Sequence, residues 1–412
     1  MGEETMGEVE VKVPLGRAAE TFRLERDACS HGLFMMAPNQ WDPPSRTLSR
    51  PLRLISGGHS VLVSISQPPD LSGHLRLRVH GMSSLSEQNQ ASLLGQVVRM
   101  LRLSDDDEII AQEFRRLAEI SEGEVSRWIG GFGGRVFRSP TLFEDMVKCI
   151  LLCNCQWSRS LKMAASLCDL QTKLSKDAND IAPKTPAKKE RKRKRKAEKT
   201  EDEDEEHELL NNNEKSHVPG NFPTPEELAT LDEAFIAKHC KLGYRGSRII
   251  KLAKEIVAGK LHLNQLEEIS AGACLSNYQE LAYKLGRIDG FGPFTSANVL
   301  MCMGYYHEIP TDSETLRHLK QVHGKDCTAK TVQAAVKDVY GAYGSLRFLV
   351  YWAEMWYFYE QRFGKLSEMS YGEYSLITGS NMRERKADAC EMEKEDIPLR
   401  LFRKPKDPSL PR

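Results

Sequence analysis

The chain has 412 residues and balances 58 Lys and Arg against 58 Asp and Glu, so its formal charge gives no sign of a nucleic-acid partner. The length allows two or three domains, and a hydrophobic share of 40% excludes a wholly disordered chain. No apolar run approaches the roughly 18–20 residues that span a bilayer, and the acidic start MGEETMGEVEVK is not expected to be a secretory signal.

The first part of the chain carries strand patterns followed by a helical one. Ser60–Ser66 reads SVLVSIS and Leu75–His80 reads LRLRVH, and both alternate apolar with polar residues as half-buried strands do. Gln88–Leu103 then carries leucines and valines at helical spacing. Weaker strand candidates are Phe22–Arg26 and Leu52–Ile55. We therefore expect a flexible N-terminus over residues 1–20 and a small α+β domain over residues 21–125.

Helical periodicity dominates the rest of the chain. One helix is preceded by Thr224 and Glu227 in the capping-box spacing. The expected helices are Phe114–Ile120, Leu142–Leu152, Ser158–Leu170, Glu226–His239, Arg245–Ala258, Leu275–Gly286, Thr295–Tyr305, Glu314–Val322, Thr331–Tyr340 and Ser345–Phe363. They define a helical core made of residues 126–170 and 221–365. We expect the tail, residues 366–412, to fray because it has mixed charge and late prolines.

Residues 171–220 interrupt the helical core with a highly charged segment. It contains 13 basic and 12 acidic residues and almost no aromatic or β-branched side chains, so it cannot bury a core. We expect a disordered insertion. Its run Lys188–Lys196, KKERKRKRK, suits a nuclear import receptor, and the alternative is a solvated charge block neutralised by its acidic neighbours.

Ten cysteines are spread along the chain without a C-x2-C pair. Cys153 and Cys155 form a C-x-C motif, but no second cysteine pair follows it. With no export signal expected, the thiols should be reduced, and the role of small buried apolar residues suits them. We expect no metal site from this pattern.

The most informative motif lies in Leu285–Gly304, LGRIDGFGPFTSANVLMCMG. Gly290 and Gly292 bracket one apolar residue in a tight turn, and Pro293 then presets φ for a helix that begins at once. Glycines allow another group to come close to the backbone. The N–H groups of the following first helical turn would form an anion site suited to a phosphate. The alternative is a plain corner between two helices.

Residues 238–260, which we call the basic segment, favour DNA as the source of that phosphate. The segment contains seven cations and one anion, Glu255, in a neutral protein. Such a local excess of cations is the pattern expected for contact with a duplex backbone. The alternative, a solvated helix face, would usually interleave Glu with Lys. Lys251 and Lys254 are the candidates for phosphate contacts.

Asp312 lies twenty residues beyond Gly292, in the segment IPTDSETLRHL. Its place after a proline and beyond a phosphate-type turn makes its carboxylate the candidate catalytic group. The alternative is a capping box formed by Thr311 and Glu314, which would make Asp312 an ordinary anion in the first helical turn.

A Gly-x-Gly hairpin between helices, followed by Pro-x-Asp, resembles the helix–hairpin–helix DNA glycosylases. The chain is most similar to the branch that contains 8-oxoguanine glycosylase and the inducible 3-methyladenine glycosylases. The resemblance covers roughly residues 20–365 without the insertion. It implies a mainly α fold, in which a small antiparallel α+β N-terminal domain precedes a two-lobed helical core. It also implies an enzyme that flips a damaged base out of the duplex and cuts its glycosidic bond.

The resemblance also assigns roles to residues. The segment ILLCNCQWSR resembles the family's orphan-base segment, which places contacts to the orphaned base on Asn154 and Arg159. LGYRGS resembles the family's LGYRAR, so Tyr244 would be the wedge that fills the vacated stack and Arg245 a third orphan-base contact. Trp352 falls near the aromatic that sandwiches the flipped base, with core packing as the alternative.

Two departures from the family pattern bear on the chemistry. Phe294 occupies the position of the Schiff-base lysine of the 8-oxoguanine branch, where the 3-methyladenine branch has an aromatic residue. The iron–sulfur cysteine cluster of related groups is absent from the sequence. We therefore expect a monofunctional glycosylase for a modified purine, in which Asp312 stabilises an oxocarbenium-like sugar. We expect no cofactor, with a monovalent cation at the hairpin as an option.

A second hypothesis is a non-catalytic reader of damaged or bent DNA with the same fold. Both hypotheses need the glycine hairpin and the basic segment, but only the enzyme needs the Asp312 carboxylate. The expected partners are duplex DNA with damaged bases and an import receptor. We expect a nuclear monomer that does not associate with membranes.

Overall fold

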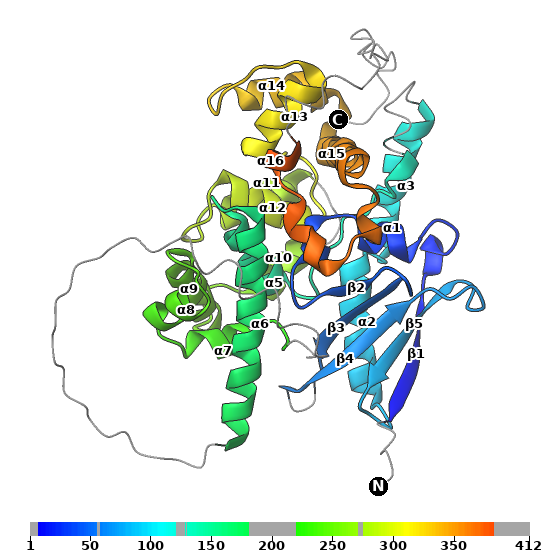
Figure 1. Cartoon of the computed structure of the whole chain (residues 1–412), viewed down its shortest axis with the longest axis vertical. Coiled ribbons are helices and arrows are strands. Elements are labelled where there is room, and N and C mark those ends of the chain that lie inside the picture. Colours follow the sequence, from blue (N-terminus) through cyan, green and yellow to red (C-terminus); the bar gives the residue numbers. More distant parts are fainter. Residues whose placement is uncertain are drawn as a thin grey trace, which may run out of the picture.

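Strands between residues 8 and 80 build a five-stranded antiparallel sheet, drawn in blue at the lower right of Figure 1. The computed structural model describes residues 7–55, 58–120, 128, 130–180, 220–270 and 275–382. The strand order is β1-β5-β4-β3-β2. The bounds are β1 Glu8–Pro14, β2 Gln40–Asp42, β3 Thr47–Arg53, β4 Ser60–Ser66 and β5 His74–His80. Leu75, Leu77 and Val79 of β5 are buried, and helix α2 (Glu87–Leu101) packs against β1 and β3.

The two strongest strand predictions are confirmed, whereas the start of the chain differs from expectation. β4 has the predicted bounds, and β5 begins one residue earlier than predicted. The prediction of a flexible N-terminus is wrong from residue 8 onward, because β1 pairs with β5 along its whole length and buries Val11 and Val13. The predicted strand Phe22–Arg26 is also wrong. Helix α1 (Leu24–Ala28) forms there, and the Asp27 carboxylate accepts the Arg23 N–H just before its first turn.

Helices are the main secondary structure in the rest of the described chain, and they confirm the mainly α class. Their bounds are α3 Asp105–Ile120, α5 Leu142–Leu152, α6 Trp157–Asp180, α7 Pro225–Ala229, α8 Glu233–His239, α9 Arg245–Val257, α10 Leu263–Ser270, α11 Leu275–Leu285, α12 Pro293–Cys302, α13 Ser313–His323, α14 Val332–Tyr340, α15 Arg347–Phe363 and α16 Gly379–Met382. Short 3-10 turns are η1 Gly16–Ala18, η2 Gly32–Met35, η4 Gly341–Leu346, η5 Leu366–Glu368 and η6 Tyr371–Leu376. Within the described ranges, no helix combines the length and the apolar character needed to cross a membrane.

One predicted helix is divided in the structure. The capping box of Thr224 and Glu227 is present at the start of α7, as predicted. The chain then breaks before α8, because the Asp232 carboxylate accepts the N–H groups of Ala234 and Phe235 and caps a second helix. α10 was not expected from the sequence, and α5 has the predicted bounds.

Parts of the expected insertion and of the expected tail are ordered. α6, the long green helix of Figure 1, continues to Asp180, so residues 171–180 are helical. The remainder of the insertion, including Lys188–Lys196, lies outside the described residues, as do residues 383–412. Residues 366–382 are not frayed. The indole N–H of Trp41 donates to the carbonyl of Ser367 at 2.7 Å, and that of Trp157 donates to the carbonyl of Tyr374 at 2.8 Å.

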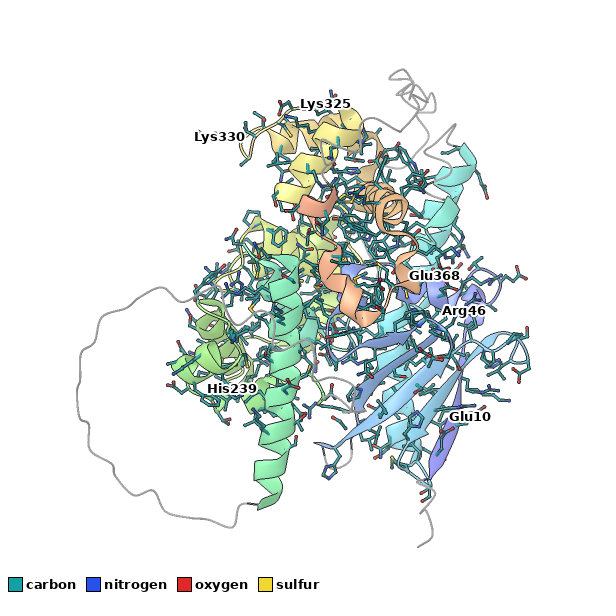
Figure 2. All side chains as sticks on the ribbon, in the orientation of Figure 1. Glu10, Arg46, His239, Lys325, Lys330 and Glu368 are labelled. Carbon is teal, nitrogen blue, oxygen red and sulfur yellow. The ribbon has the colours of Figure 1, made fainter. Side chains whose placement is uncertain are left out.

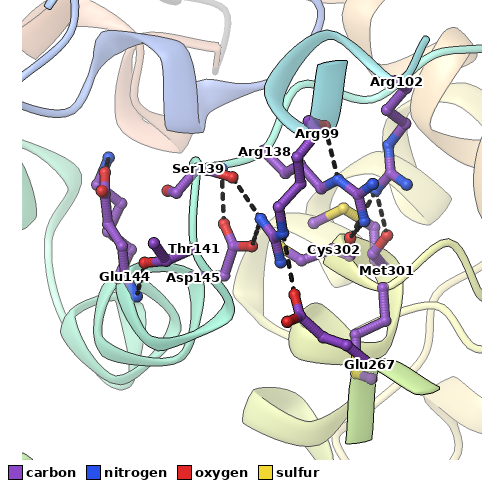
Figure 3. A network of polar contacts seen from close by, with 12 residues as sticks. Arg99, Arg102, Arg138, Ser139, Thr141, Glu144, Asp145, Glu267, Met301 and Cys302 are labelled. Atoms are coloured by element: carbon purple, nitrogen blue, oxygen red, sulfur yellow. Dashed lines mark hydrogen bonds and ion pairs between the residues drawn. The ribbon is translucent and has the colours of Figure 1, made fainter. Parts of the chain in front are cut away.

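Two arginines, one buried at the end of α2 and one partly buried before α5, hold the end of α12 (Figure 3). Arg102, at the end of α2, donates from Nη2 to the carbonyls of Met301 at 2.7 Å and Cys302 at 2.9 Å. Arg138 donates to the Cys302 carbonyl at 2.8 Å. The last carbonyls of a helix lack intrahelical partners and carry the negative end of its dipole. The two guanidinium groups therefore satisfy and neutralise the C-terminus of α12. Asp107 pairs with Arg102 at 3.2 Å.

A second buried ion pair joins the sheet to the helices. Arg50 of β3 lies 2.9 Å from Glu144 of α5, and Lys148 lies 2.7 Å from the same carboxylate. Burial alone would raise the pKa of Glu144, but Arg50 and Lys148 lower it to about 2. The carboxylate is therefore ionised and paired at neutral pH. Charged side chains on the outer surface, such as Glu10, Arg46 and Glu368 in Figure 2, are exposed and form no buried ion pair of this kind.

We predict that Arg102→Met destabilises the protein by about 3–5 kcal/mol, because buried Asp107 loses its closer guanidinium partner and the last carbonyls of α12 lose one of their donors. The control is Arg17→Met, since Arg17 pairs with Asp105 at an exposed position, where the loss should stay below about 1 kcal/mol. Urea unfolding at neutral pH measures both. Equal losses of unfolding free energy in the two variants would show that the bonds from Arg102 to α12 contribute little to stability.

Candidate functional site

The hairpin, residues 286–292, joins α11 to α12 and contains two glycines with different requirements. Gly290 has φ +81°, in the left-handed region that favours glycine, and a Cβ there would lie 2.6 Å from Cδ of Arg248. Gly292 has φ −89° and ψ −178°, which any residue adopts, and a Cβ there would meet no described atom within 4 Å. Glycine at 292 therefore leaves open space in front of α12.

The first turn of α12 faces that space. Gly292 is the N-cap residue and provides no side-chain capping bond, and Pro293 occupies the first helical position. The N–H groups of a first helical turn have no acceptor within the helix. Together with the positive end of the helix dipole, they suit an anion. The structure thus has the geometry expected from the Gly-x-Gly motif.

The basic segment runs along α9 beside the hairpin. Lys254 is exposed. Lys251 is also exposed, but its Nζ lies 2.9 Å from Oδ2 of Asp289, the residue before Gly290. The hydrogen bond and charge of Lys251 lower the pKa of Asp289, so this carboxylate is ionised at neutral pH. Asp289 therefore competes with a phosphate for Lys251.

Cys153, in the loop between α5 and α6, connects three parts of the expected site. Its carbonyl oxygen accepts hydrogen bonds from the Tyr244 hydroxyl at 3.2 Å and from the Arg245 guanidinium. Its Sγ lies 2.9 Å from Oγ1 of Thr295 in the first turn of α12. Asn154 follows with φ +46° and an exposed side chain. The expected orphan-base loop, the wedge and the hairpin helix therefore lie together.

The structure changes the expected role of Arg245. Its side chain is only 3% exposed, and its Nη2 also donates to the Asn154 carbonyl at 3.0 Å. The prediction of a direct orphan-base contact does not fit this geometry, because the guanidinium is turned inward to hold the loop that carries Asn154. Arg159 is exposed and donates to the Lys241 carbonyl at 3.3 Å, next to the same surface.

Arg248 is a candidate binding residue that the sequence analysis did not single out. Its Cζ lies 4.8 Å from the centre of the Tyr244 ring, a cation–π contact, and its side chain packs against Gly290. It follows Tyr244 by four positions, which places both side chains on one face of α9. That spacing is the signal that could have identified it.

Asp312 is the N-cap of α13 and shares the capping box with Thr315. The alternative box of Thr311 and Glu314 is therefore not the one that forms. Oδ1 of Asp312 accepts the Thr315 N–H at 2.9 Å and lies 3.1 Å from its hydroxyl, which in turn lies 3.0 Å from the Tyr351 hydroxyl. Burial raises the pKa of Asp312 above its ordinary value, against the lowering effect of the hydrogen bonds from Thr315.

Trp352 belongs to an aromatic group on α15 and is only partly buried. Its ring stacks on Phe348 with centroids 5.9 Å apart and an angle of 7°, and His31 lies 4.5 Å away. Its indole N–H donates to the Ser30 carbonyl at 2.8 Å. Burial, with a contribution from Arg102, lowers the pKa of His31 to about 3, so this imidazole is neutral. Trp352 therefore packs against its neighbours, and part of its side chain remains accessible to solvent.

Phe294 is half-buried in the first turn of α12. Its carbonyl accepts the Asn298 side-chain amide at 2.9 Å, an ordinary bond within the helix. Its hydrocarbon ring provides no group that could attack a sugar.

A cavity of about 210 Å³ lies at the opposite end of α12 from the hairpin. Its polar lining includes Arg99, Asp107, Arg138 and Glu267. None of the predicted site residues lines it. We therefore do not assign it to the candidate site.

Comparisons with known proteins support the fold. No protein-family model matches the sequence, and no curated protein matches it. Among solved structures, the chain is similar to MBOgg1 in complex with a low-affinity DNA ligand, with a TM-score of 0.51, 18% identity, and coverage of 86% of this chain and 96% of that chain. This similarity confirms the expected fold, a helical core preceded by a small antiparallel N-terminal domain.

Two further solved structures have lower scores. The 3-methyladenine DNA glycosylase from Archaeoglobus fulgidus has a TM-score of 0.49 at 17% identity, covering 87% of this chain and 99% of that chain. The Clostridium acetobutylicum 8-oxoguanine glycosylase/lyase, in complex with double-stranded DNA containing cytosine opposite 8-oxoG, has a TM-score of 0.46 at 16% identity, covering 76% and 88%.

We predict that Asp312→Asn does not destabilise the protein at neutral pH. A carboxyl whose pKa is raised by folding binds its proton more tightly in the folded state, so its ionised form costs stability above that pKa. Asparagine stays neutral and can still cap α13. The free energy of unfolding, measured by urea between pH 3 and 8, should therefore be higher for the variant at neutral pH. The difference should shrink as the pH falls through the raised pKa. A less stable variant at pH 7 would show that Asp312 is an ordinary favourable N-cap anion.

Proposed function

From the glycosylase fold and the surface beside the hairpin, we propose that the chain is a DNA glycosylase that excises a flipped, modified purine from duplex DNA. The observation that carries the proposal is the placement of exposed Tyr244, with Arg248 stacked on it, next to Gly290. An aromatic side chain there can replace the base lost from the stack. The open first turn of α12 and the exposed lysines of α9 can bind the backbone phosphates.

Asn154 and Arg159 contact the base left without its partner. Both side chains are exposed on the surface that carries Tyr244, and an amide and a guanidinium can satisfy the open pairing edge of a base. Arg245 supports this contact from behind through its bonds to the Cys153 and Asn154 carbonyls.

Asp312 stabilises the positive charge that develops on the sugar when the C–N bond breaks. Its partly buried position supports this role, since a carboxylate with little water around it interacts more strongly with a developing cation. Trp352 supports the flipped base, because its partly exposed ring sits in a stacked aromatic group.

The enzyme releases the base by hydrolysis and leaves the strand intact. Phe294 in the first turn of α12 supports this part of the proposal, because a hydrocarbon side chain cannot form a Schiff base with the sugar. We place the activity in the nucleus on the basis of Lys188–Lys196. The competing proposal, a non-catalytic reader of damaged DNA, uses the same surface without Asp312.

The excision test uses duplexes that each carry one defined purine lesion (oxidised, alkylated or deaminated) opposite cytosine or thymine. We predict that the native chain releases one of these bases and leaves an abasic site, which is nicked only after alkali. Asp312→Asn should lower the single-turnover rate by about 100-fold or more while duplex affinity stays unchanged. Asp232→Asn is the matched control, since Asp232 is also an N-cap aspartate but lies in α8.

Three results would contradict parts of the proposal. Trapping of a covalent protein–DNA adduct by borohydride would exclude the monofunctional mechanism. Full excision by Asp312→Asn would remove Asp312 from the chemistry. Tight binding of a damaged duplex without excision of any purine lesion would favour the reader.

We predict that Asp289→Asn tightens binding to undamaged duplex DNA. The change removes a negative charge beside the hairpin and releases Lys251 for a phosphate. One more phosphate contact should increase the slope of log Kd against log salt by about 0.9. Glu280→Gln is the control, because Glu280 is exposed on α11 and pairs with Lys284. Equal effects of the two substitutions on affinity and slope would mean that the Lys251 pair plays no specific part.

A further inference from the structure

A buried group of metal-binding side chains lies where α13, α14 and α15 meet. His318 and His323 belong to α13, and Glu354 belongs to α15. Their side chains are 0%, 3% and 1% exposed. One ligand atom from each residue lies within 4.8 Å of the others. The sequence analysis predicted no metal site and did not use these residues.

The hydrogen bonds of this group converge on one oxygen of Glu354. Nε2 of His318 and Nε2 of His323 each lie 2.9 Å from Oε2 of Glu354, and the Tyr340 hydroxyl donates to the same oxygen. Oε1 of Glu354 is buried and has no hydrogen-bond partner among the described residues. Buried polar atoms without partners are rare and call for a physical explanation. A cation bound by this carboxylate would provide one.

The sequence spacing and the local space both suit an ion. The motif His318-x4-His323 falls within the H-x3-5-H spacing of zinc sites. A cavity of about 10 Å³, lined in part by His323, Tyr340 and Glu354, lies beside the ligands. This is close to the smallest space that holds one water molecule, so the space beside the ligands is about the size of one small ligand.

The atoms that would bind the ion already face one another, since Nε2 of each histidine lies 2.9 Å from Oε2 of Glu354. Metal binding requires neutral imidazole and deprotonated carboxylate. An ion placed between these atoms would therefore displace the protons that now form their hydrogen bonds.

We propose that His318, His323 and Glu354 bind a Zn²⁺ ion, with the Tyr340 oxygen or a water molecule as the fourth ligand. Two imidazoles and a carboxylate suit zinc, and a site enclosed by protein suits a structural ion. The ion would tie the C-terminal end of α13 to α15. His318 and His323 follow Asp312 by six and eleven positions along α13, roughly 9 and 16 Å, so the ion stands apart from Asp312 and holds the helix that Asp312 caps. The proposal does not depend on the glycosylase activity.

The test uses the full chain with any polyhistidine tag removed. We expect about one zinc per chain by elemental mass spectrometry, a fall in Tm on chelation, and recovery of Tm with added Zn²⁺. Replacement by Co²⁺ should give the visible absorption bands of a four-coordinate ion with nitrogen and oxygen ligands. A thiolate-to-cobalt charge-transfer band would place the ion on cysteines and overturn the proposal.

Glu354→Gln and His318→Gln test the ligands. Loss of a metal ligand should weaken Zn²⁺ affinity by more than about 100-fold, since loss of outer partners of a metal ligand already costs 10–100-fold. His307→Gln is the matched control, because His307 is a half-buried histidine stacked on Tyr278, and it should bind Zn²⁺ like the native chain. Where a variant does not fold, as judged by circular dichroism, the Co²⁺ spectrum of the native chain decides.

Absence of stoichiometric zinc, together with a Tm that neither chelator nor Zn²⁺ changes, would overturn the proposal. The three side chains would then form a hydrogen-bonded network only. Native-like zinc affinity in a folded Glu354→Gln or His318→Gln chain would place the metal elsewhere and overturn it as well.

Discussion

The grip of Arg102 and Arg138 on the last carbonyls of α12 is the interaction on which the arrangement of the site depends. It fixes the C-terminal end of α12 against α2 of the N-terminal domain and against the segment before α5, and the hairpin lies at the other end of the same helix. The dipole of α12 gives its C-terminal end a negative and its N-terminal end a positive partial charge. Cations neutralise the negative end inside the protein, while the positive end, which has no side-chain cap at Gly292, stays available for an external anion.

The residues around the hairpin divide into buried ones that hold the surface and exposed ones that are accessible from solvent. Cys153 and Arg245 are buried and bond to each other and to their neighbours, so they set the positions of Asn154 and Tyr244. Asn154 and Tyr244 are exposed. Resemblance to a known motif does not distinguish the two groups. Burial does, because Arg245 is only 3% exposed and its Nη2 already donates to two backbone carbonyls.

The surroundings of Asp312 disfavour its ionised form, while other contacts hold its helix, α13, in place. Burial makes the Asp312 carboxylate harder to ionise, whereas its capping bonds with Thr315 favour the charged form. The hydroxyl of Tyr351 on α15 contacts Thr315 near the start of α13, and the group of His318, His323 and Glu354 joins the same two helices further along. Both contacts keep α13 against α15. The catalytic role proposed for Asp312 requires such a rigid frame.

The sequence by itself determined the class of fold and the local features whose cause is local. Alternation located β4 and β5, the Thr224 capping box started α7, and the Gly-x-Gly-Pro motif placed the hairpin, because these patterns depend on near neighbours. The tertiary structure decided the rest. β1 became a strand only because β5 lies beside it, and Arg245 turned inward only because the Cys153 carbonyl meets it from a distant segment. The zinc candidate likewise needs Glu354 to come within 2.9 Å of two histidines on another helix, and a distance between segments far apart in the chain exists only once they pack.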